Sequence, residues 1–298
     1  MRSLFEEIRR NQFLSYLIMF EFLVIIAVLG AVIGYIWGSM WFGLIIALVA
    51  ALIYIAIVFS SGDMLVLTMS RAKPVTKQDY PYLYHTLEGL VIAAGLKKKP
   101  KLYIIEDSAL NAFATGKNPD NSYIVVTKGL VDRLNRQELE GVLAHELSHI
   151  RNYDIRVMML AAVLVGVVVL ISDLILRSFF WGGGRKDRED RGNAVILFIA
   201  ILLALLAPLF AQLIRLAVSR RREFLADASA AMLTRYPEGL ASALEKIKKD
   251  PKPLMKTANR AMAHLYIANP FRKTRGFLTN LFSTHPPIEE RIKKLRAM

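Results

Sequence analysis

Residues 145–149, HELSH, hold two histidines four positions apart with a glutamate directly after the first. On a helix, side chains at positions i and i+4 lie on one face, so His145 and His149 can bind one metal ion. Neutral imidazoles are common zinc ligands. Glu146 lies about 100° further around the helix and can take a proton from a water held by the metal, as in zinc peptidases. The alternative is a solvated helix face without a shared role.

The chain has no cysteine, so disulfides, thiol catalysis and cysteine-ligated zinc are excluded. Any metal must therefore be held by histidine, aspartate or glutamate. A catalytic zinc needs a third protein ligand and one open position. The other elements of the chain must bring that third ligand to the HELSH helix.

Four apolar runs explain the 54% hydrophobic content, at about 13–37, 40–59, 157–176 and 194–214. The second and fourth are uncharged and, at roughly 20 residues, long enough to cross a bilayer; the first contains Glu21 and the third contains Asp173. We expect four membrane helices rather than buried helices of a soluble core. The first run is not expected to be a cleaved signal peptide, because it is too long and the second run follows almost at once.

Basic residues beside these runs predict the orientation in the membrane. Arginines precede the first run and follow the fourth, which places both termini and residues 60–156 in the cytoplasm. The basic residues of WGGGRKDREDRGN, between the third and fourth runs, oppose this orientation. The net charge of +14 favours contact with anionic lipid over nucleic acid, for which we find no binding module.

The remaining segments predict a mixed domain. Residues 76–95 read as a helix, and 101–106 and 122–127 read as strands joined by the turn-rich stretch NAFATGKNPDN. Residues 136–151 form the helix that carries HELSH. Residues 219–298 look mostly helical, with a basic loop around 270–284 and a last short helix after Pro287.

A geometric argument identifies the third ligand. His149 lies eight residues before the third run, and Glu223 lies eight residues past Arg215, where the fourth run ends. At 1.5 Å per residue both stand roughly 12 Å above the membrane, so an antiparallel pair of helices would bring Glu223 to the histidines. Asp227 lies one turn further and suits a hydrogen bond to the far nitrogen of a zinc-bound histidine. Asp173 and the acidic residues of 187–190 lie within or across the membrane and are excluded.

Four segments then carry a resemblance to a known family. HELSH, EFLAD (223–227), NAFATG (111–116) and STHPP (283–287) resemble signatures of the HtpX-type membrane zinc metalloproteases, relatives of the CAAX prenyl-protein proteases. The resemblance extends over nearly the whole chain. It implies a zinc endopeptidase with a gluzincin-like core that acts in membrane-protein quality control and the stress response. It further implies His145, His149 and Glu223 as zinc ligands, Glu146 as the base and Asp227 as their hydrogen-bonding support.

Several other residues allow both a functional and a structural interpretation. Asn111 and Ala112 could bind an extended substrate along an edge strand, or belong to an ordinary turn. His285 could donate a hydrogen bond to the oxyanion, or serve a structural role, and Arg291 is a weaker catalytic candidate. Asp154 is expected to cap a helix. His85 and His264 are expected in the core or at an interface.

The sequence therefore predicts an α-helical integral membrane protein with a cytoplasmic zincin-like α+β catalytic domain, mostly helical with a small β-sheet. Its parts are two N-terminal transmembrane helices (1–59), a catalytic part with the strand pair and HELSH helix (60–156), a transmembrane hairpin (157–218) and a cytoplasmic helical part with the third ligand (219–298). The predicted function is cleavage of misfolded or unassembled membrane proteins at the plasma membrane, with one Zn²⁺ per chain.

Three other functions were compared with this one. A CAAX-type processing protease is disfavoured because those proteins have more membrane spans. A membrane scaffold with a structural zinc gives Glu146 no role. An intramembrane protease would need its ligands inside the spans, whereas here they flank them.

Overall fold

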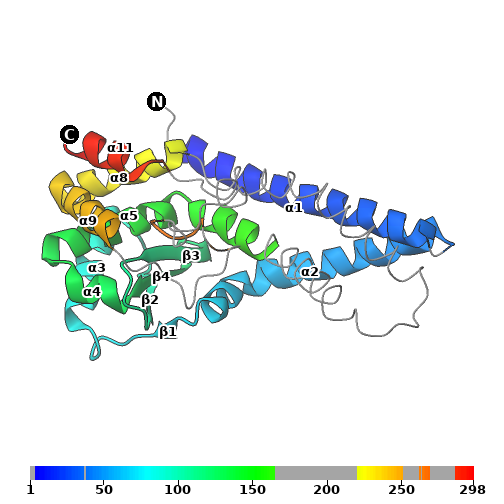
Figure 1. The fold of residues 1–298 in the computed structure, drawn as a ribbon, viewed down its shortest axis with the longest axis horizontal. Helices are drawn as coiled ribbons and strands as arrows, with labels where there is room; N and C mark the ends of the chain where they lie inside the picture. The colour runs from blue at the N-terminus through cyan, green and yellow to red at the C-terminus, as the bar shows by residue number, and fades with distance from the viewer. Residues whose placement is uncertain (1–3, 37, 165–219, 251–261, 263, 269–285) are drawn as a thin grey trace, which may run out of the picture.

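The computed structural model describes residues 4–36, 38–164, 220–250, 262, 264–268 and 286–298. The predicted fourth membrane run, most of the third, the loop 270–284 and His285 lie outside the described residues. The described chain is mostly helical with one small sheet (Figure 1).

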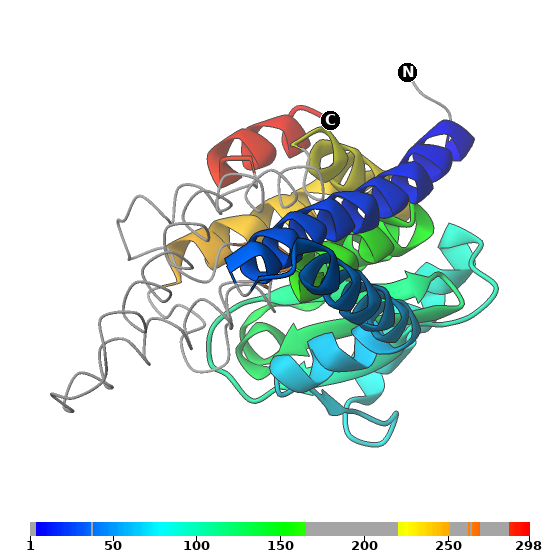
Figure 2. The same cartoon turned by 90° about the vertical axis from the view of Figure 1, so that its right-hand side faces the viewer.

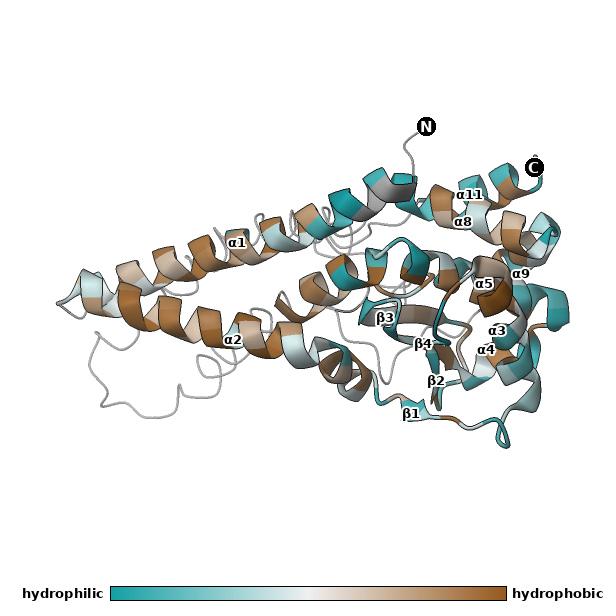
Figure 3. Ribbon diagram, turned by 180° about the vertical axis from the view of Figure 1, so that it is seen from behind, coloured by the Kyte–Doolittle hydropathy of each residue, from teal (hydrophilic) through white to brown (hydrophobic). Residues whose placement is uncertain are grey.

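The first two helices form a long hairpin that projects from the rest of the molecule (Figure 1). They are α1 (Leu4–Ile36) and α2 (Met40–Met69), and the stretches Arg9–Tyr35 and Met40–Met69 are long and apolar enough to cross a membrane. The outer part of the hairpin is largely hydrophobic (Figure 3). Large apolar side chains are exposed along the two helices, among them Trp41, Phe42 and Ile53. Such a continuous exposed apolar surface is typical of contact with lipid.

Backbone contact between α1 and α2 depends on small residues. A Cβ atom added at Gly34 would lie 2.6 Å from the Ser39 carbonyl oxygen and 2.7 Å from the Gly43 Cα. Glycine therefore allows the two helices to approach closely, as in many membrane helix pairs.

The second helix extends into the rest of the protein. Thirty residues of helix span about 45 Å, which exceeds the roughly 30 Å of a hydrocarbon core. In the last turns of α2, Val66 and Leu67 are buried in a core that also contains Val125 of the sheet. Only residues 70–72 separate α2 from the first strand.

The sheet has four strands in the order β1–β2–β4–β3. Strand β1 (Lys73–Pro74) pairs antiparallel with β2 (Lys101–Ile105), which runs parallel to β4 (Asn121–Thr127). Strand β3 (Ala112–Asn118) pairs antiparallel with β4 and lies at the edge. The prediction of a turn-rich loop between 106 and 122 was wrong for this segment, because pairing with β4 outweighs the local turn propensity.

The end of the edge strand is attached to the hairpin. The Lys117 ammonium donates to the Ser60 carbonyl of α2, and Arg156 Nε donates to the Lys117 carbonyl at 2.9 Å. Position and tilt of β3 are therefore tied to α2.

The predicted HELSH helix is confirmed with its bounds, as α5 (Arg136–Arg151). Asn135 and Glu138 form a capping box at its start. Helix α3 (Pro81–Ala94) begins at Pro81 and ends at Gly95, whose φ of 67° closes the helix in the left-handed region. Helix α4 (Lys128–Arg133) connects β4 to α5.

Three helices complete the described part of the chain: α8 (Arg220–Thr234), α9 (Pro237–Lys249) and α11 (Ile288–Leu295). Helix α9 packs closely on α5, since a Cβ at Gly141 would lie 2.6 Å from the Leu240 nitrogen. Residues 154–164, which follow α5 after a turn, are helical. Seen along the hairpin, α1 lies above this helical stretch, with the sheet on its far side (Figures 1 and 2). Leu14 and Ile18 of α1 share one core with residues 157–164.

Candidate metal centre

The functional side chains of HELSH are almost fully buried in the C-terminal half of α5. His145 is 1% exposed, Glu146 2% and His149 3%. The Nε2 atoms of the two histidines lie 3.2 Å apart, and their rings are nearly perpendicular at 89°. The two imidazoles therefore face one point, as their spacing predicts.

Glu223 reaches this point from α8. Its Oε2 lies 3.8 Å from His145 Nε2, and its Oε1 lies 3.6 Å from His149 Nε2. One ligand atom from each of the three residues lies within 4.8 Å of the other two. Within the described part of the chain, this is the group whose arrangement could hold a metal ion.

The hydrogen bonds behind the imidazoles indicate what lies between them. His145 Nδ1 is 3.0 Å from Asp227 Oδ1, and His149 Nδ1 is 3.0 Å from Asp154 Oδ2. Because carboxylates accept hydrogen bonds, these contacts favour a proton on each Nδ1, which leaves each Nε2 able to bind a cation. The two Nε2 atoms, 3.2 Å apart, are close enough to share one, either a proton or a metal ion.

Both the protonation of the histidines without metal and the spacing of their nitrogens are consistent with a cation shared by the two imidazoles. Burial lowers the pKa of His149, but the Asp154 carboxylate and the other acidic groups outweigh it and raise that pKa to about 9. The pKa of His145 is lowered, chiefly by burial. A tetrahedral zinc with bonds of about 2.0–2.1 Å would separate two ligand nitrogens by roughly 3.3–3.4 Å, close to the observed spacing. The donor set of two nitrogens and a carboxylate fits a divalent metal.

The charges around the imidazoles also favour a cation. Four buried carboxylates lie around the imidazoles, those of Glu146, Asp154, Glu223 and Asp227, together with the buried guanidinium groups of Arg222 and Arg291. Their formal charges sum to minus two before the imidazoles are counted. A cation bound between the imidazoles reduces this excess of negative charge.

Glu146 lies beside the ligands and touches the edge strand. Burial raises the pKa of its carboxyl to about 7, partly offset by the positive charge on His149 and by a hydrogen bond from the backbone of Ala114 in β3. The carboxylate is therefore placed between the metal ligands and the strand edge.

Arg291 of α11 supports the site, which sequence reasoning underestimated. Its Nε and Nη2 donate to the two oxygens of Asp227 at 2.9 and 2.7 Å, and Nη1 lies 3.5 Å from Glu223 Oε2. Burial would raise the pKa of Asp227, but Arg291 and His145 outweigh it and lower that pKa to about 2. Asp227 therefore remains ionised between the guanidinium and the imidazole.

Asp154 was expected to cap a helix, and the structure gives it a different role. Its Oδ2 receives the hydrogen bond of His149, and its Oδ1 accepts a hydrogen bond from Asn11 of α1 at 2.7 Å. Tyr153, with a φ of 61°, ends α5 and turns the chain so that Asp154 faces back toward His149. The spacing of five residues after His149 was the available signal, but Asn11 could be linked to it only through the fold.

Asn111 and Ala112 lie at the start of the edge strand, where they bond to another segment of the same chain. Asn111 Nδ2 donates to the Ala268 carbonyl at 2.9 Å, and the Ala112 carbonyl accepts from Ile267 N at 2.9 Å. Because backbone groups alternate along a strand, Ala112 and Ala114 both turn theirs away from β4. This edge faces Glu146.

The other histidines differ from one another. His264 is 1% exposed and its Nε2 lies 3.1 Å from the Met158 carbonyl, which confirms a core position. His85 does not lie in the core, since its side chain is 55% exposed and pairs with Glu88, so an interface is what stays a prediction for it. His285 lies outside the described residues.

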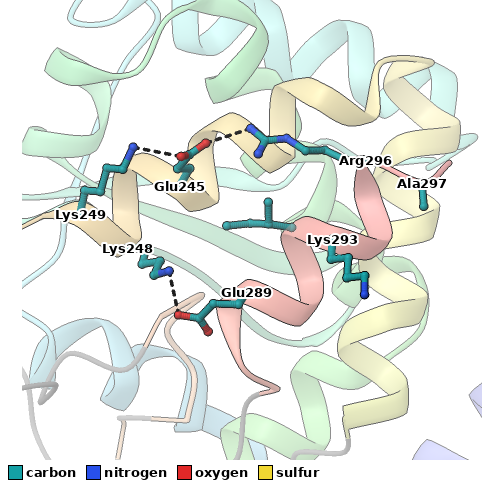
Figure 4. A pocket seen from close by; sticks show the side chains of 8 residues that line it. Glu245, Lys248, Lys249, Glu289, Lys293, Arg296 and Ala297 are labelled. Carbon is teal, nitrogen blue, oxygen red and sulfur yellow. Dashed lines mark hydrogen bonds and ion pairs between the residues drawn. The ribbon is translucent and has the colours of Figure 1, made fainter.

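A pocket of roughly 450 Å³ between α9 and α11 is separate from the metal ligands (Figure 4). Charged side chains line it, and several are paired, as in Lys249 with Glu245 and Lys248 with Glu289. It contains none of the metal-site residues.

Known proteins of one family are similar to this chain. Peptidase family M48 matches residues 77–298. A protease HtpX homolog of Dictyoglomus turgidum is 52% identical over 240 residues, covering 80% of this chain and 77% of that protein. A protease HtpX homolog of Thermoanaerobacter pseudethanolicus is 41% identical over 300 residues, covering 100% and 98%.

Among solved structures, the crystal structure of Ste24p from S. mikatae matches with a TM-score of 0.47 and 20% identity, over 96% of this chain and 64% of that one. The family match covers most of the chain and includes every residue of the metal centre except Asn11. The chain belongs to peptidase family M48 and is a membrane metalloprotease.

Proposed function

We propose that the chain is a zinc endopeptidase whose metal is held by His145, His149 and Glu223. The observation that carries this proposal is the buried Glu146 carboxylate beside a group of three side chains that could hold a metal ion. A structural site, in which protein ligands fill every position, would leave Glu146 without a task.

The residues divide the chemistry between them. Zinc, when bound, supplies a Lewis acid that polarises the peptide carbonyl and makes water a better nucleophile. Glu146 takes the proton from the attacking water and delivers it to the leaving amine. Asp227 and Asp154 hold the imidazoles in the tautomer that binds metal. Arg291 keeps Asp227 in place, and His285 is the proposed donor to the oxyanion.

The substrate is an extended polypeptide that adds to the edge strand. The outward backbone groups of Ala112 and Ala114 face the side on which Glu146 lies, so a strand paired there passes the base. In this structure Asn111 and Ala112 bond to residues 267–268, so a substrate pairs beyond them or displaces that segment. Pairing through the backbone accepts many sequences, which suits misfolded or unassembled membrane proteins.

We place the catalytic part on the cytoplasmic side of the plasma membrane, from the arginines that flank the apolar runs. The absence of cysteine allows a direct test with single introduced cysteines. Met40→Cys, at the turn of the hairpin, should react with an impermeant maleimide on intact cells. Lys128→Cys, at the start of α4, should react only after lysis. The reverse pattern would show the opposite orientation.

The activity test uses detergent-purified full chain with casein as an unfolded substrate. Wild type, Glu146→Gln and a chelator-stripped sample with zinc returned are compared, and Glu140→Gln on the same helix is the matched control. We expect cleavage by wild type, the control and the zinc-restored sample, and loss of more than about 100-fold in Glu146→Gln. One bound zinc per chain without cleavage would favour the scaffold function instead.

A further inference from the structure

One buried amide of α1 lies next to the metal centre. Asn11 is 1% exposed, although it lies near the start of the first candidate membrane span. Its Nδ2 donates to Asp154 Oδ1 at 2.7 Å and to the Asn152 carbonyl at 2.8 Å, and its Oδ1 accepts from Arg222 at 3.2 Å. Both amide hydrogens and the amide oxygen are therefore used in one network.

The two oxygens of Asp154 have different partners. Oδ2 faces His149 Nδ1 at 3.0 Å, while Oδ1 faces Asn11 and lies 3.5 Å from Arg222 Nη1. Without the Asn11 donors, the guanidinium of Arg222 would be the remaining strong partner of Oδ1. Because that partner is a cation at the far side, the carboxylate would be drawn away from the imidazole.

We propose that Asn11 is a positioning residue for the metal centre, which acts through Asp154 on His149. Helix α1 therefore contributes a side chain to the support of the metal site, in addition to anchoring the protein. A polar amide buried on an apolar helix is costly unless all its hydrogen bonds are made, and here they are made to the segment that supports a ligand. The inference rests on the proposed metal site but not on hydrolysis.

The test measures metal binding by the full chain in detergent. Asn11→Leu keeps the branched shape of the side chain and removes its donors and its acceptor. Ser15→Ala is the matched control, because Ser15 is equally buried one turn further along α1 and, among the described residues, its side chain bonds to the Asn11 carbonyl. Zinc dissociation constants are measured by competition with a chelator, and the visible spectrum of the Co²⁺-loaded protein reports the ligand geometry. Unfolding temperatures of the metal-free forms separate this effect from general loosening of the fold.

We expect the zinc dissociation constant of Asn11→Leu to rise about 10-fold, the lower end of the range for partners of metal-bound histidines, since Asn11 acts one step further out. The Co²⁺ spectrum should change as well, and Ser15→Ala should leave both unchanged. In an Asp154→Ala background the Asn11 substitution should add nothing, because its effect passes through that carboxylate.

Two results would overturn the inference. One is wild-type zinc affinity and an unchanged Co²⁺ spectrum in Asn11→Leu. The other is an equal loss of affinity with and without Asp154. If Asp154→Ala does not fold, the comparison of Asn11→Leu with Ser15→Ala decides alone. Wild-type protein that binds zinc but cleaves nothing would contradict the proposed function while leaving this test intact.

Discussion

The guanidinium of Arg291 in α11 contacts two segments that lie apart in the sequence, helix α8 and residue 267. It donates to both oxygens of Asp227 and to the Ile267 carbonyl, and it lies close to Glu223. The side chain is fully buried, so each of these bonds forms away from water. A planar fork can make the paired contact to a carboxylate, whereas an ammonium cannot.

At this scale we expect Arg291→Lys to lower both stability and activity. Loss of the paired contact in a buried site should cost about 2–4 kcal/mol, toward the range for breaking a buried ion pair. Thermal unfolding in detergent and casein cleavage measure the two effects. Arg296→Lys is the control, because Arg296 makes a similar contact to Glu238 at the exposed surface and should barely change the melting temperature. Equal changes in the two variants would contradict this account.

Between elements, α5 is fixed to α9 at the helix start. Glu138 accepts hydrogen bonds from the Asn135 nitrogen, Ser242 and Lys246 at 2.7–2.8 Å. Burial opposes ionisation of this carboxyl, but the hydrogen bond from Lys246 and the other donors lower its pKa below the usual range. The group therefore stabilises the folded protein only while it is ionised.

The lowered pKa of Glu138 predicts how the stability of Glu138→Gln should depend on pH. A lowered folded pKa contributes stability above the unfolded value of about 4.3, and the contribution is lost as the pH falls through the folded pKa. At pH 7 the variant should be less stable than wild type by about 1–3 kcal/mol, and the difference should shrink below about pH 4. Melting temperatures across this range, with Glu140→Gln alongside, are the measurement. A difference that grows in acid would contradict the prediction.

The hairpin gives a second prediction for elements. Gly34→Ala should separate α1 from α2 and lower the melting temperature, because the new methyl group meets the Ser39 carbonyl and Gly43. Gly89→Ala in α3 is the matched control, since nothing lies within 4 Å of the added atom. There alanine should leave stability unchanged or raise it by up to about 1 kcal/mol. A Gly34→Ala protein as stable as the control would show that the close approach does not matter.

For the whole molecule, local patterns predicted the local elements. The bounds of α5 were predictable because a capping box and an apolar face lie within its own sequence. The edge strand β3 was read as a loop, since its pairing with β4 is what makes it a strand. Asn11 gave no sequence signal of its own, and Arg291 was only a weak catalytic candidate. Their roles depend on partners 143 and 64 residues away, which only the packing of α1 and α11 against the centre brings near.

Because β3 is attached to α2, we expect the cleavage rate to depend on the thickness of the surrounding bilayer. A helix longer than the hydrocarbon core changes its tilt when lipid acyl chains are shortened or lengthened. Because Lys117 is bonded to Ser60 and β1 follows α2 after residues 70–72, such a change moves the strand on which the substrate is expected to lie. In vesicles of equal lipid charge, we therefore expect the cleavage rate to vary with acyl-chain length. A constant rate would show that the catalytic part moves independently of the membrane. A varying rate would mean that the lipid composition of the membrane influences the cleavage rate of this protease.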